Sequence, residues 1–167
     1  MNTIRECSVD EQATILGIVN AAAQRYRGVI PDDCWHDPYM NLGQLRREIV
    51  AGVTFWGYDE ADRDLVGVMG VQQVKDVTLI RHAYVHPDHQ GKGIGGTLLR
   101  NLEHLADGRI LIGTWADAKW AIRFYEGHGY VLASPQETPA LLRTYWDISR
   151  RQIETSVVLS KSPRRPG

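Results

Sequence analysis

The spacing of apolar residues changes along the chain and separates segments expected to form strands from segments expected to form helices. Residues 65–74 and 77–85 are runs rich in Val, Leu and Ile joined by the short break Lys75-Asp76, which is typical of paired antiparallel strands. Residues 93–105 instead repeat apolar side chains every three or four positions, as the buried face of a helix does: Ile94, Leu98, Leu99, Leu102 and Leu105. This alternation predicts a mixed α/β (α+β) protein.

Capping and turn residues extend this pattern over the whole chain. A capping box of Ser8 with Glu11 opens the first predicted helix, and Asn41 with Gln44 opens the second. The predicted helices are 8–25, 41–52, 93–105, 117–128 (capped by Asp117) and 140–146 (after Thr138-Pro139), and the predicted strands are 4–7, 53–58, 65–74, 77–85, 109–115, 130–133 and 153–159. Because a helix joins strand 77–85 to strand 109–115, these two strands should be parallel.

Size, charge and cysteine content limit the classes of function. A chain of 167 residues is expected to form one domain, over residues 1–160, with a frayed tail at 161–167. A net charge of −1 offers no basic field for nucleic acid or an anionic membrane, and no apolar run approaches the roughly 20 residues of a membrane span. Cys7 and Cys34 follow no disulfide spacing and should be free thiols. These features favour a cytoplasmic protein.

A glycine-dense segment between a strand and a helix is the strongest sign of chemistry. Glycines at 91, 93, 95 and 96 lack a Cβ, so the main-chain amides of the loop can close on a bulky anionic group. The following helix adds free N-terminal amides and the positive end of its dipole. The segment therefore predicts a ligand that carries phosphate.

Two familiar phosphate loops fit this segment poorly. A Walker loop requires Ser or Thr after its lysine, whereas Lys92 is followed by Gly93. Gly91, Gly93 and Gly96 match the dinucleotide pattern G-x-G-x-x-G, with Asp117 roughly 20 residues on. That turn, however, normally follows its strand directly, and residues 87–90 intervene here. A nucleotide-binding Rossmann-like protein is the weaker alternative.

Two sequence blocks resemble the GNAT superfamily of acetyl-CoA-dependent N-acetyltransferases. The segment Gln90-Gly-Lys-Gly-Ile-Gly95 resembles its signature Q/R-x-x-G-x-G/A, and Ala121-Ile-Arg-Phe-Tyr-Glu-Gly-His-Gly-Tyr130 resembles its A-x-x-x-Y-E-x-x-G-F/Y block. The resemblance covers nearly the whole chain. It implies a mostly antiparallel sheet flanked by helices and splayed at the two parallel central strands, with acetyl-CoA as co-substrate in the gap.

The resemblance also carries cofactor contacts onto particular residues. The strand-end backbone of Ala83, Tyr84 and Val85 would pair with pantetheine, and a loop would hold the pyrophosphate through its amides: Gln90, Gly91, Lys92, Gly93, Ile94, Gly95 and Gly96. No metal is expected, because His82, His86 and His89 lie on a predicted strand and bend, where their side chains should diverge.

Catalytic roles are less completely matched. Tyr125 occupies the tyrosine that often protonates the departing sulfur in this family; the alternative is an aromatic that packs on the sheet. Many relatives place a glutamate where this chain has Gly113, or an asparagine where it has Ala118, as the candidate general base. His82 is therefore the local candidate for the base, against a half-buried histidine of structural role, and Asp117 is interpreted as a helix cap rather than a base.

The loop between the first two helices usually recognises the acceptor in this family. Here it carries acidic and aromatic residues, with Tyr26 and Trp35 as predicted contacts to a small-molecule amine. The prediction is direct acetyl transfer to a primary amine. A non-catalytic acyl-CoA-binding or sensing module is the alternative, and the sequence leaves the oligomeric state open, a homodimer included.

Overall fold

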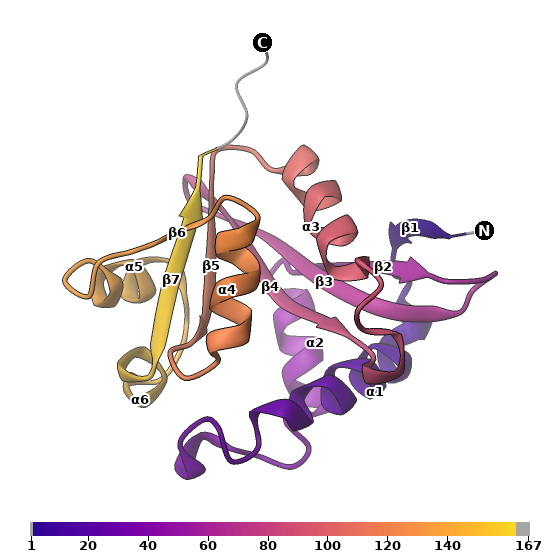
Figure 1. Ribbon diagram of the computed structural model, residues 1–167, viewed down its shortest axis with the longest axis horizontal. Coiled ribbons are helices and arrows are strands. Elements are labelled where there is room, and N and C mark those ends of the chain that lie inside the picture. The colour runs from indigo at the N-terminus through magenta and orange to yellow at the C-terminus, as the bar shows by residue number, and fades with distance from the viewer. Residues whose placement is uncertain (1, 163–167) are drawn as a thin grey trace.

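The computed structural model describes residues 2–162, and it folds around one seven-stranded mixed sheet with strand order β1-β2-β3-β4-β5-β7-β6 (Figure 1). The strands are β1 (Thr3–Glu6), β2 (Thr54–Asp59), β3 (Leu65–Val74), β4 (Val77–Val85), β5 (Arg109–Trp115), β6 (Val131–Leu132) and β7 (Ser156–Lys161). The α-helices are α1 (Gln12–Ala23), α2 (Leu42–Val50), α3 (Ile94–Leu105), α4 (Lys119–Gly127), α5 (Thr138–Tyr145) and α6 (Arg150–Glu154). Four 3-10 turns complete the order: Val9–Glu11, Gln24–Tyr26, Asp32–Cys34 and Pro87–His89.

The two faces of the sheet are covered by different helices. Helices α3 and α4 pack on one face, against Val66, Met69, Ile80 and Ile112. Helices α1 and α2 pack on the other face, over β2 and β3, and α5 covers β5 and β7 on that side through Leu142. Successive side chains of a strand point to opposite faces of the sheet. Because helices cover both faces, β3 and β5 are apolar at most positions.

The predicted pairing of the central strands is confirmed. Strands β2, β3 and β4 pair antiparallel, as their short connections require, and β4 pairs parallel to β5 across the α3 crossover. The predicted second helix is confirmed as well, with the Asn41 side chain accepting the amide proton of Gln44.

Three predicted boundaries were wrong. Helix α4 begins at Lys119 with Ala118 at its N-cap, so Asp117 contributes no side-chain cap. Ile153 lies in helix α6, whose first turn is capped by Ser149, and the last strand starts only at Ser156. Thr138 is the first residue of α5 instead of its cap, and its hydroxyl donates to the Ser134 carbonyl.

The predicted frayed tail is only partly described. Lys161 belongs to β7, and its ammonium donates to Glu103 and to the carbonyl of His128. Residues 163–167 of that predicted tail lie outside the described part of the chain. Among residues 2–162, no helix is long and apolar enough to cross a membrane.

Candidate active site

The parallel strands β4 and β5 pair over only part of their length. Their register runs from Val77 opposite Arg109 to Ile80 opposite Ile112 and then stops. Beyond that point β4 stays paired with β3 and β5 with β7, so the sheet divides into two arms. The expected splay is thus confirmed, and it leaves backbone groups of both strands facing an open gap.

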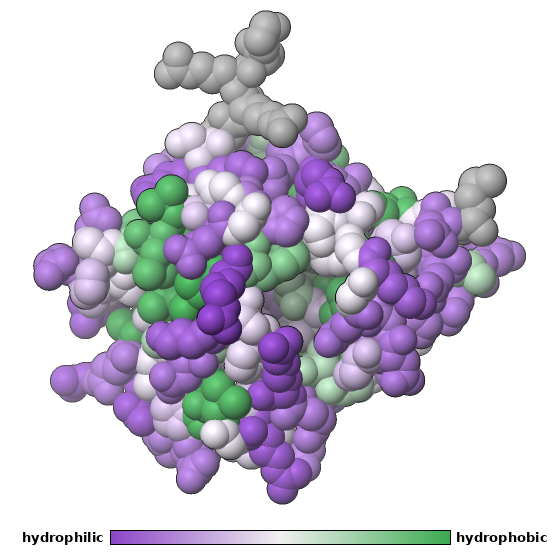
Figure 2. Space-filling model, viewed as in Figure 1, coloured by the Kyte–Doolittle hydropathy of each residue, from purple (hydrophilic) through white to green (hydrophobic). Residues whose placement is uncertain are grey.

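A cavity of about 490 Å³ occupies the gap on the side of α3 and α4. Figure 2 shows this face hollowed between those helices, with pale and green side chains at its floor. Nine of the ten predicted cofactor contacts line the cavity: Ala83, Tyr84, Val85, Gln90, Gly91, Gly93, Ile94, Gly95 and Gly96. The cavity volume is in the range typical of small-molecule sites.

At the junction of the glycine loop with α3, the backbone has the geometry that an anion-binding site needs. Gly93 is the N-cap of α3 with φ of 80°, and Gly91 has φ of 82°. The first hydrogen bond of the helix runs from the Thr97 amide to the Gly93 carbonyl. The amides of Ile94, Gly95 and Gly96 precede that bond, so they have no partner within the helix and are available to a ligand.

Gly95 and Gly96 have a packing role that the sequence interpretation missed. A Cβ on Gly96 would lie 2.9 Å from the His128 ring, and one on Gly95 would lie 3.4 Å from the Phe124 ring. Both rings belong to the α4 segment. Glycine at these two positions therefore allows α3 to approach α4 closely, while Gly91 and Gly93 face open space.

Two side chains of the loop are engaged within the protein. Gln90 donates to the Val85 carbonyl at 2.9 Å, which ties the loop back to the end of β4. Lys92 is the one predicted contact outside the cavity lining, and its Nζ pairs with Glu60 Oε1 at 2.8 Å. Glu60 also pairs with His89. Glu60 thus holds the loop from the β2–β3 turn, and the contact with Lys92 lowers the pKa of its carboxyl.

Tyr125 lies on α4 and lines the cavity, with 7% of the residue exposed. Its ring makes edge contacts with Phe124 and Tyr130, so both the packing role and the catalytic role foreseen for it are compatible with its position. Burial raises its pKa above the ordinary value of 10.0. The phenol therefore keeps its proton through the neutral range and is a hydrogen-bond donor there.

His82 occupies a β-bulge in β4. Two β4 residues, His82 and Ala83, lie opposite Met69 of β3, and His82 has φ of 54°. A positive φ at a residue other than glycine is a strained conformation that functional sites often hold. The His82 Nε2 atom lies 2.9 Å from Oε2 of Glu48 on α2. At this distance the two groups form an ion pair when the imidazole is protonated, and neither atom has another partner in the described chain.

A second, smaller cavity of about 100 Å³ lies on the opposite side of the gap. The two cavities share five lining residues: Tyr26, His82, Tyr84, Gly113 and Thr114. Burial raises the pKa of Tyr26 to about 12 and that of Tyr84 well above its usual value. Of these five residues, His82 is the one whose side chain has a ring nitrogen that can accept a proton.

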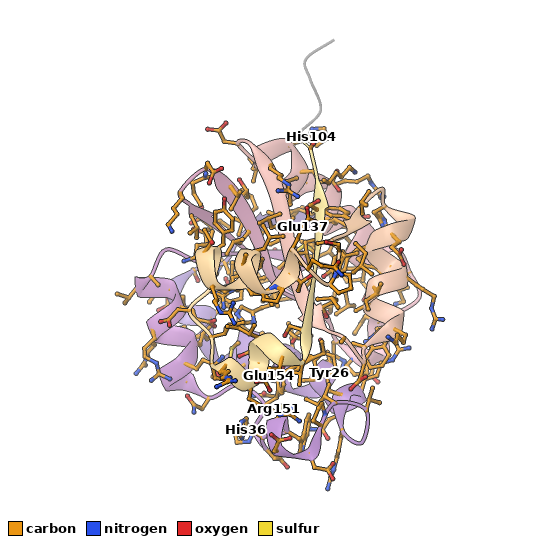
Figure 3. All side chains as sticks on the ribbon, turned by 90° about the vertical axis from the view of Figure 1, so that its left-hand side faces the viewer. Tyr26, His36, His104, Glu137, Arg151 and Glu154 are labelled. Atoms are coloured by element: carbon orange, nitrogen blue, oxygen red, sulfur yellow. The ribbon has the colours of Figure 1, made fainter. Side chains whose placement is uncertain are left out.

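The predicted substrate loop reaches this second cavity through its tyrosines. Tyr26 and Tyr39 line it, whereas Trp35 stacks behind Tyr39 at a ring distance of 5.9 Å and lines neither cavity. Tyr39 is fixed by the Trp115 indole, which donates to its hydroxyl at 2.7 Å. Figure 3 shows Tyr26 and Arg151 at the same end of the sheet, where α6 meets this loop.

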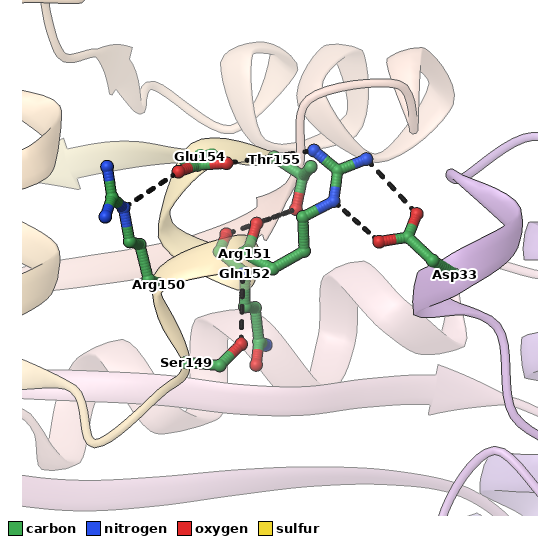
Figure 4. Close-up of polar contacts among 7 residues, drawn as sticks. All are labelled: Asp33, Ser149, Arg150, Arg151, Gln152, Glu154 and Thr155. Atoms are coloured by element: carbon green, nitrogen blue, oxygen red, sulfur yellow. Dashed lines mark hydrogen bonds and ion pairs between the residues drawn. The ribbon is translucent and has the colours of Figure 1, made fainter.

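The loop's acidic residues do not converge on the cavities. Arg151 of α6 forms a two-point ion pair with Asp33, with contacts of 2.8 and 3.2 Å, and also approaches Glu154 (Figure 4). The Arg151 pairing lowers the pKa of the Asp33 carboxyl. Asp33 thus attaches α6 to this loop.

The position expected for a base on β5 is filled by packing. The Trp146 indole lies against Gly113, 3.2 Å from where a Cβ would be, and Ala118 is fully buried at the start of α4. Glu48, Thr114 and Trp146 were missed by the sequence interpretation. Glu48 stands among the charged residues of an ordinary amphipathic helix, and no local signal separates it from Arg46 or Arg47. The residues 2–162 contain no cluster of three or more potential metal ligands.

Comparison with known proteins agrees with this geometry. A family model described as an acetyltransferase (GNAT) domain matches residues 51–132, which include the splayed strands, the glycine loop and Tyr125. In the solved structure of the PaiA N-acetyltransferase from Thermoplasma acidophilum with coenzyme A, the similarity covers 97% of this chain and 99% of that one, with 18% identity and a TM-score of 0.72.

Two further similar structures have different acceptors in their names. The ribosomal-protein-S18-alanine N-acetyltransferase from Escherichia coli is 17% identical, with a TM-score of 0.70 over 100% of this chain and 97% of that one. The spermidine N-acetyltransferase from Vibrio cholerae, in complex with CoA and spermine, is 16% identical, with a TM-score of 0.65 over 97% and 95%. At such identities the likeness concerns the fold. With the splayed sheet and the glycine loop inside the matched region, residues 51–132 are identified as a GNAT acetyltransferase domain, and the chain has the fold of solved GNAT-family acetyltransferases.

Proposed function

We propose that this protein transfers the acetyl group of acetyl-CoA to a primary amine of a small molecule, by direct attack of the amine. The observation that carries the proposal is the cavity of about 490 Å³ at the splay, where the free amides of α3, the end of β4 and Tyr125 face one space. In acetyl transfer, the α3 amides would bind the diphosphate, the end of β4 would polarise the thioester, and Tyr125 would donate a proton.

The cofactor would be bound mainly by main-chain groups. The amides at 94–96 and the positive end of the α3 dipole suit the diphosphate of CoA. Beyond Ile80, β4 has no β5 partner, so residues 83–85 offer backbone groups to the pantetheine arm in the way that a neighbouring strand would. Lys92 is paired with Glu60, so it would have to leave Glu60 before it could make its predicted contact with the phosphate.

The chemical step needs three proton transfers. His82 would take the proton that the ammonium must lose, and the neutral amine then attacks the thioester carbon to form the C–N bond. As the C–S bond breaks, Tyr125 would donate its proton to the departing sulfur, and the second proton lost by the nitrogen would restore the phenol. Unpaired N–H groups of β4 would stabilise the negative charge on the carbonyl oxygen. Proximity and orientation in the ternary complex supply much of the remaining rate.

The second cavity is the proposed entrance for the acceptor. It meets the first at His82, and its volume of about 100 Å³ admits only a small group, which favours a small-molecule amine or a single exposed chain end. Tyr26 is the proposed acceptor contact, and Trp35 would act by supporting Tyr39. The expected compartment remains the cytoplasm, because Cys7 and Cys34 are both free thiols.

An acceptor screen tests the proposal. Release of free thiol from acetyl-CoA is measured with amino acids, polyamines, aminoglycosides and peptides as acceptors. Turnover with at least one small amine, strongly reduced in the Tyr125→Phe and His82→Asn variants, is the expected result. Tight CoA binding without turnover of any amine would contradict the enzyme and indicate an acyl-CoA-binding module.

A further inference from the structure

Glu48 on α2 contacts two consecutive residues of β4. Its Oε1 accepts a hydrogen bond from Arg81 Nη2 at 2.9 Å, and its Oε2 lies 2.9 Å from His82 Nε2. Consecutive strand residues normally point to opposite faces of a sheet. The bulge at His82 brings both side chains to the α2 side, so one carboxylate meets both.

This carboxylate is partly buried and held in its charged form. Side-chain exposure is 14% for Glu48, 14% for His82 and 17% for Arg81. Burial alone would raise the pKa of Glu48, but the contact with His82 and the charges of His82 and Arg81 more than offset it, so the pKa is lowered. Gln72 accepts a further hydrogen bond from Arg81 at 3.2 Å and holds the guanidinium in place.

His82 has few other polar neighbours. Phe55 of β2 stacks on its ring with centroids 6.0 Å apart, and Tyr26 and Tyr84 share its cavities. No aspartate or glutamate within the described residues lines either cavity. Arg25 lines the larger cavity with His82, and its guanidinium lies over the Trp120 ring. Glu48 is the charged group in contact with the imidazole, and Arg81 pairs with Glu48.

We propose that Glu48 is a positioning residue that orients the His82 imidazole across the gap and stabilises the imidazolium formed when His82 takes the proton of the acceptor amine. Arg81 keeps Glu48 ionised and directed at His82. The inference rests on the proposed function, in which His82 is the base. The inference adds Glu48, a residue of α2 that does not itself touch the substrate.

The test compares Glu48→Gln with a matched control. Glu103→Gln also removes a partly buried carboxylate that pairs with a cation, at 2.9 Å from Lys161 and with 15% exposure, but on α3 and outside both cavities. Glu48→Gln should lower kcat by roughly 10- to 100-fold, a part of what general base catalysis typically contributes, with CoA affinity unchanged. Glu48→Asp should recover part of the loss, and Glu103→Gln should leave kcat unaltered.

A double variant separates positioning from general stability. His82→Asn removes the base, and asparagine tolerates the positive φ at this position. If Glu48 acts through His82, the double variant is no slower than His82→Asn alone. Multiplied losses in the double variant, or a kcat of Glu48→Gln equal to that of Glu103→Gln, would overturn the inference.

A measurement without substrate separates this inference from the proposed function. The His82 ring resonances are compared by NMR at one fixed pH in the wild type, Glu48→Gln and Glu103→Gln. Loss of a carboxylate that lies 2.9 Å from Nε2 should shift these resonances in Glu48→Gln, and Glu103→Gln should leave them in place. Unmoved resonances in Glu48→Gln would refute the pairing. Shifted resonances in a protein that turns over no amine would refute the enzyme and leave the pairing established.

Discussion

The phenol of Tyr125 combines burial with access to the cavity. Burial raises its pKa, so it keeps its proton in the neutral range and remains a hydrogen-bond donor there. In the proposed reaction, this phenol would assist the departure of sulfur by donating as charge develops. The neighbouring Tyr130 is equally buried and lies outside the lining of the cavity, so the pair offers a comparison between packing and chemistry.

Replacing Tyr125 with Phe should lower kcat by about 100-fold while the CoA affinity changes little, because the ring still packs and only the donor is lost. Steady-state kinetics with the best acceptor, together with calorimetric CoA titration, checks this. Tyr130→Phe is the control and should retain wild-type kcat. Equal rates in Tyr125→Phe and wild type would reduce Tyr125 to a packing role.

Elements of the N-terminal region are joined by an ion cluster at the edge of the sheet. Arg5 of β1 donates to both carboxylate oxygens of Glu11 at 2.7 Å each, and to Asp59 of β2 at 2.6 Å. Glu11 also closes the capping box with Ser8 ahead of α1. The hydrogen bonds from Arg5 lower the pKa of Glu11 to about 2.

Glu11→Gln should therefore reduce the free energy of unfolding by about 1.5 kcal/mol at neutral pH, the scale of a hydrogen bond to a charged group. Because the pKa of Glu11 is lower in the folded state, its ionised carboxylate stabilises the fold at pH values above the unfolded pKa near 4.5. This stabilisation is lost as the pH falls towards 2. Denaturant unfolding from pH 7 to pH 2 should show the difference between wild type and variant shrinking over that window. Glu6→Gln, at an exposed position of β1, is the control, and a difference independent of pH would contradict the pairing.

The loop before α3 can be tested with a pair of matched substitutions. Gly93 and Gly28 both have positive φ, at 80° and 76°, and a Cβ at either would meet nothing within 4 Å. Aspartate at either site therefore brings the same strain and charge. Gly93→Asp should abolish CoA binding in a calorimetric titration, and Gly28→Asp should preserve it. Equal CoA affinity in both would remove the loop from the site.

Most elements were predictable because their signals are local. The Asn41 cap, the Lys75-Asp76 turn and the apolar stripe of α3 each act within a few residues. The errors also have local causes: the start of α4 is set by burial of Ala118 against the aromatic cluster, so Asp117 has no cap to make. The Ile153 segment is apolar enough for a strand, but the Ser149 cap makes it a helix.

At the scale of the whole molecule, the site depends on contacts between distant segments. The glycine loop and Tyr125 could be singled out in the sequence because family motifs mark them. The Glu48–His82 pair, the bulge and the Trp146 indole over Gly113 arise from packing of separate elements, which no single segment encodes. The acidic loop residues illustrate the same limit, since Asp33 pairs with Arg151 from far along the chain.

A ligand that binds the folded state in this gap should stabilise the whole chain. Coenzyme A at 100 times its dissociation constant should add roughly 2.7 kcal/mol to the free energy of unfolding. Chemical denaturation with and without CoA measures this, and NAD at the same concentration is the control. Stabilisation by NAD alone would support the Rossmann-like alternative.

The most direct measurement is a crystal structure of the protein soaked with coenzyme A. The account predicts the diphosphate on the amides of residues 94–96, the pantetheine arm beside residues 83–85 in the gap between β4 and β5, and the sulfur near Tyr125. Coenzyme A bound at another surface, or absent from a gap that remains open to solvent, would contradict it.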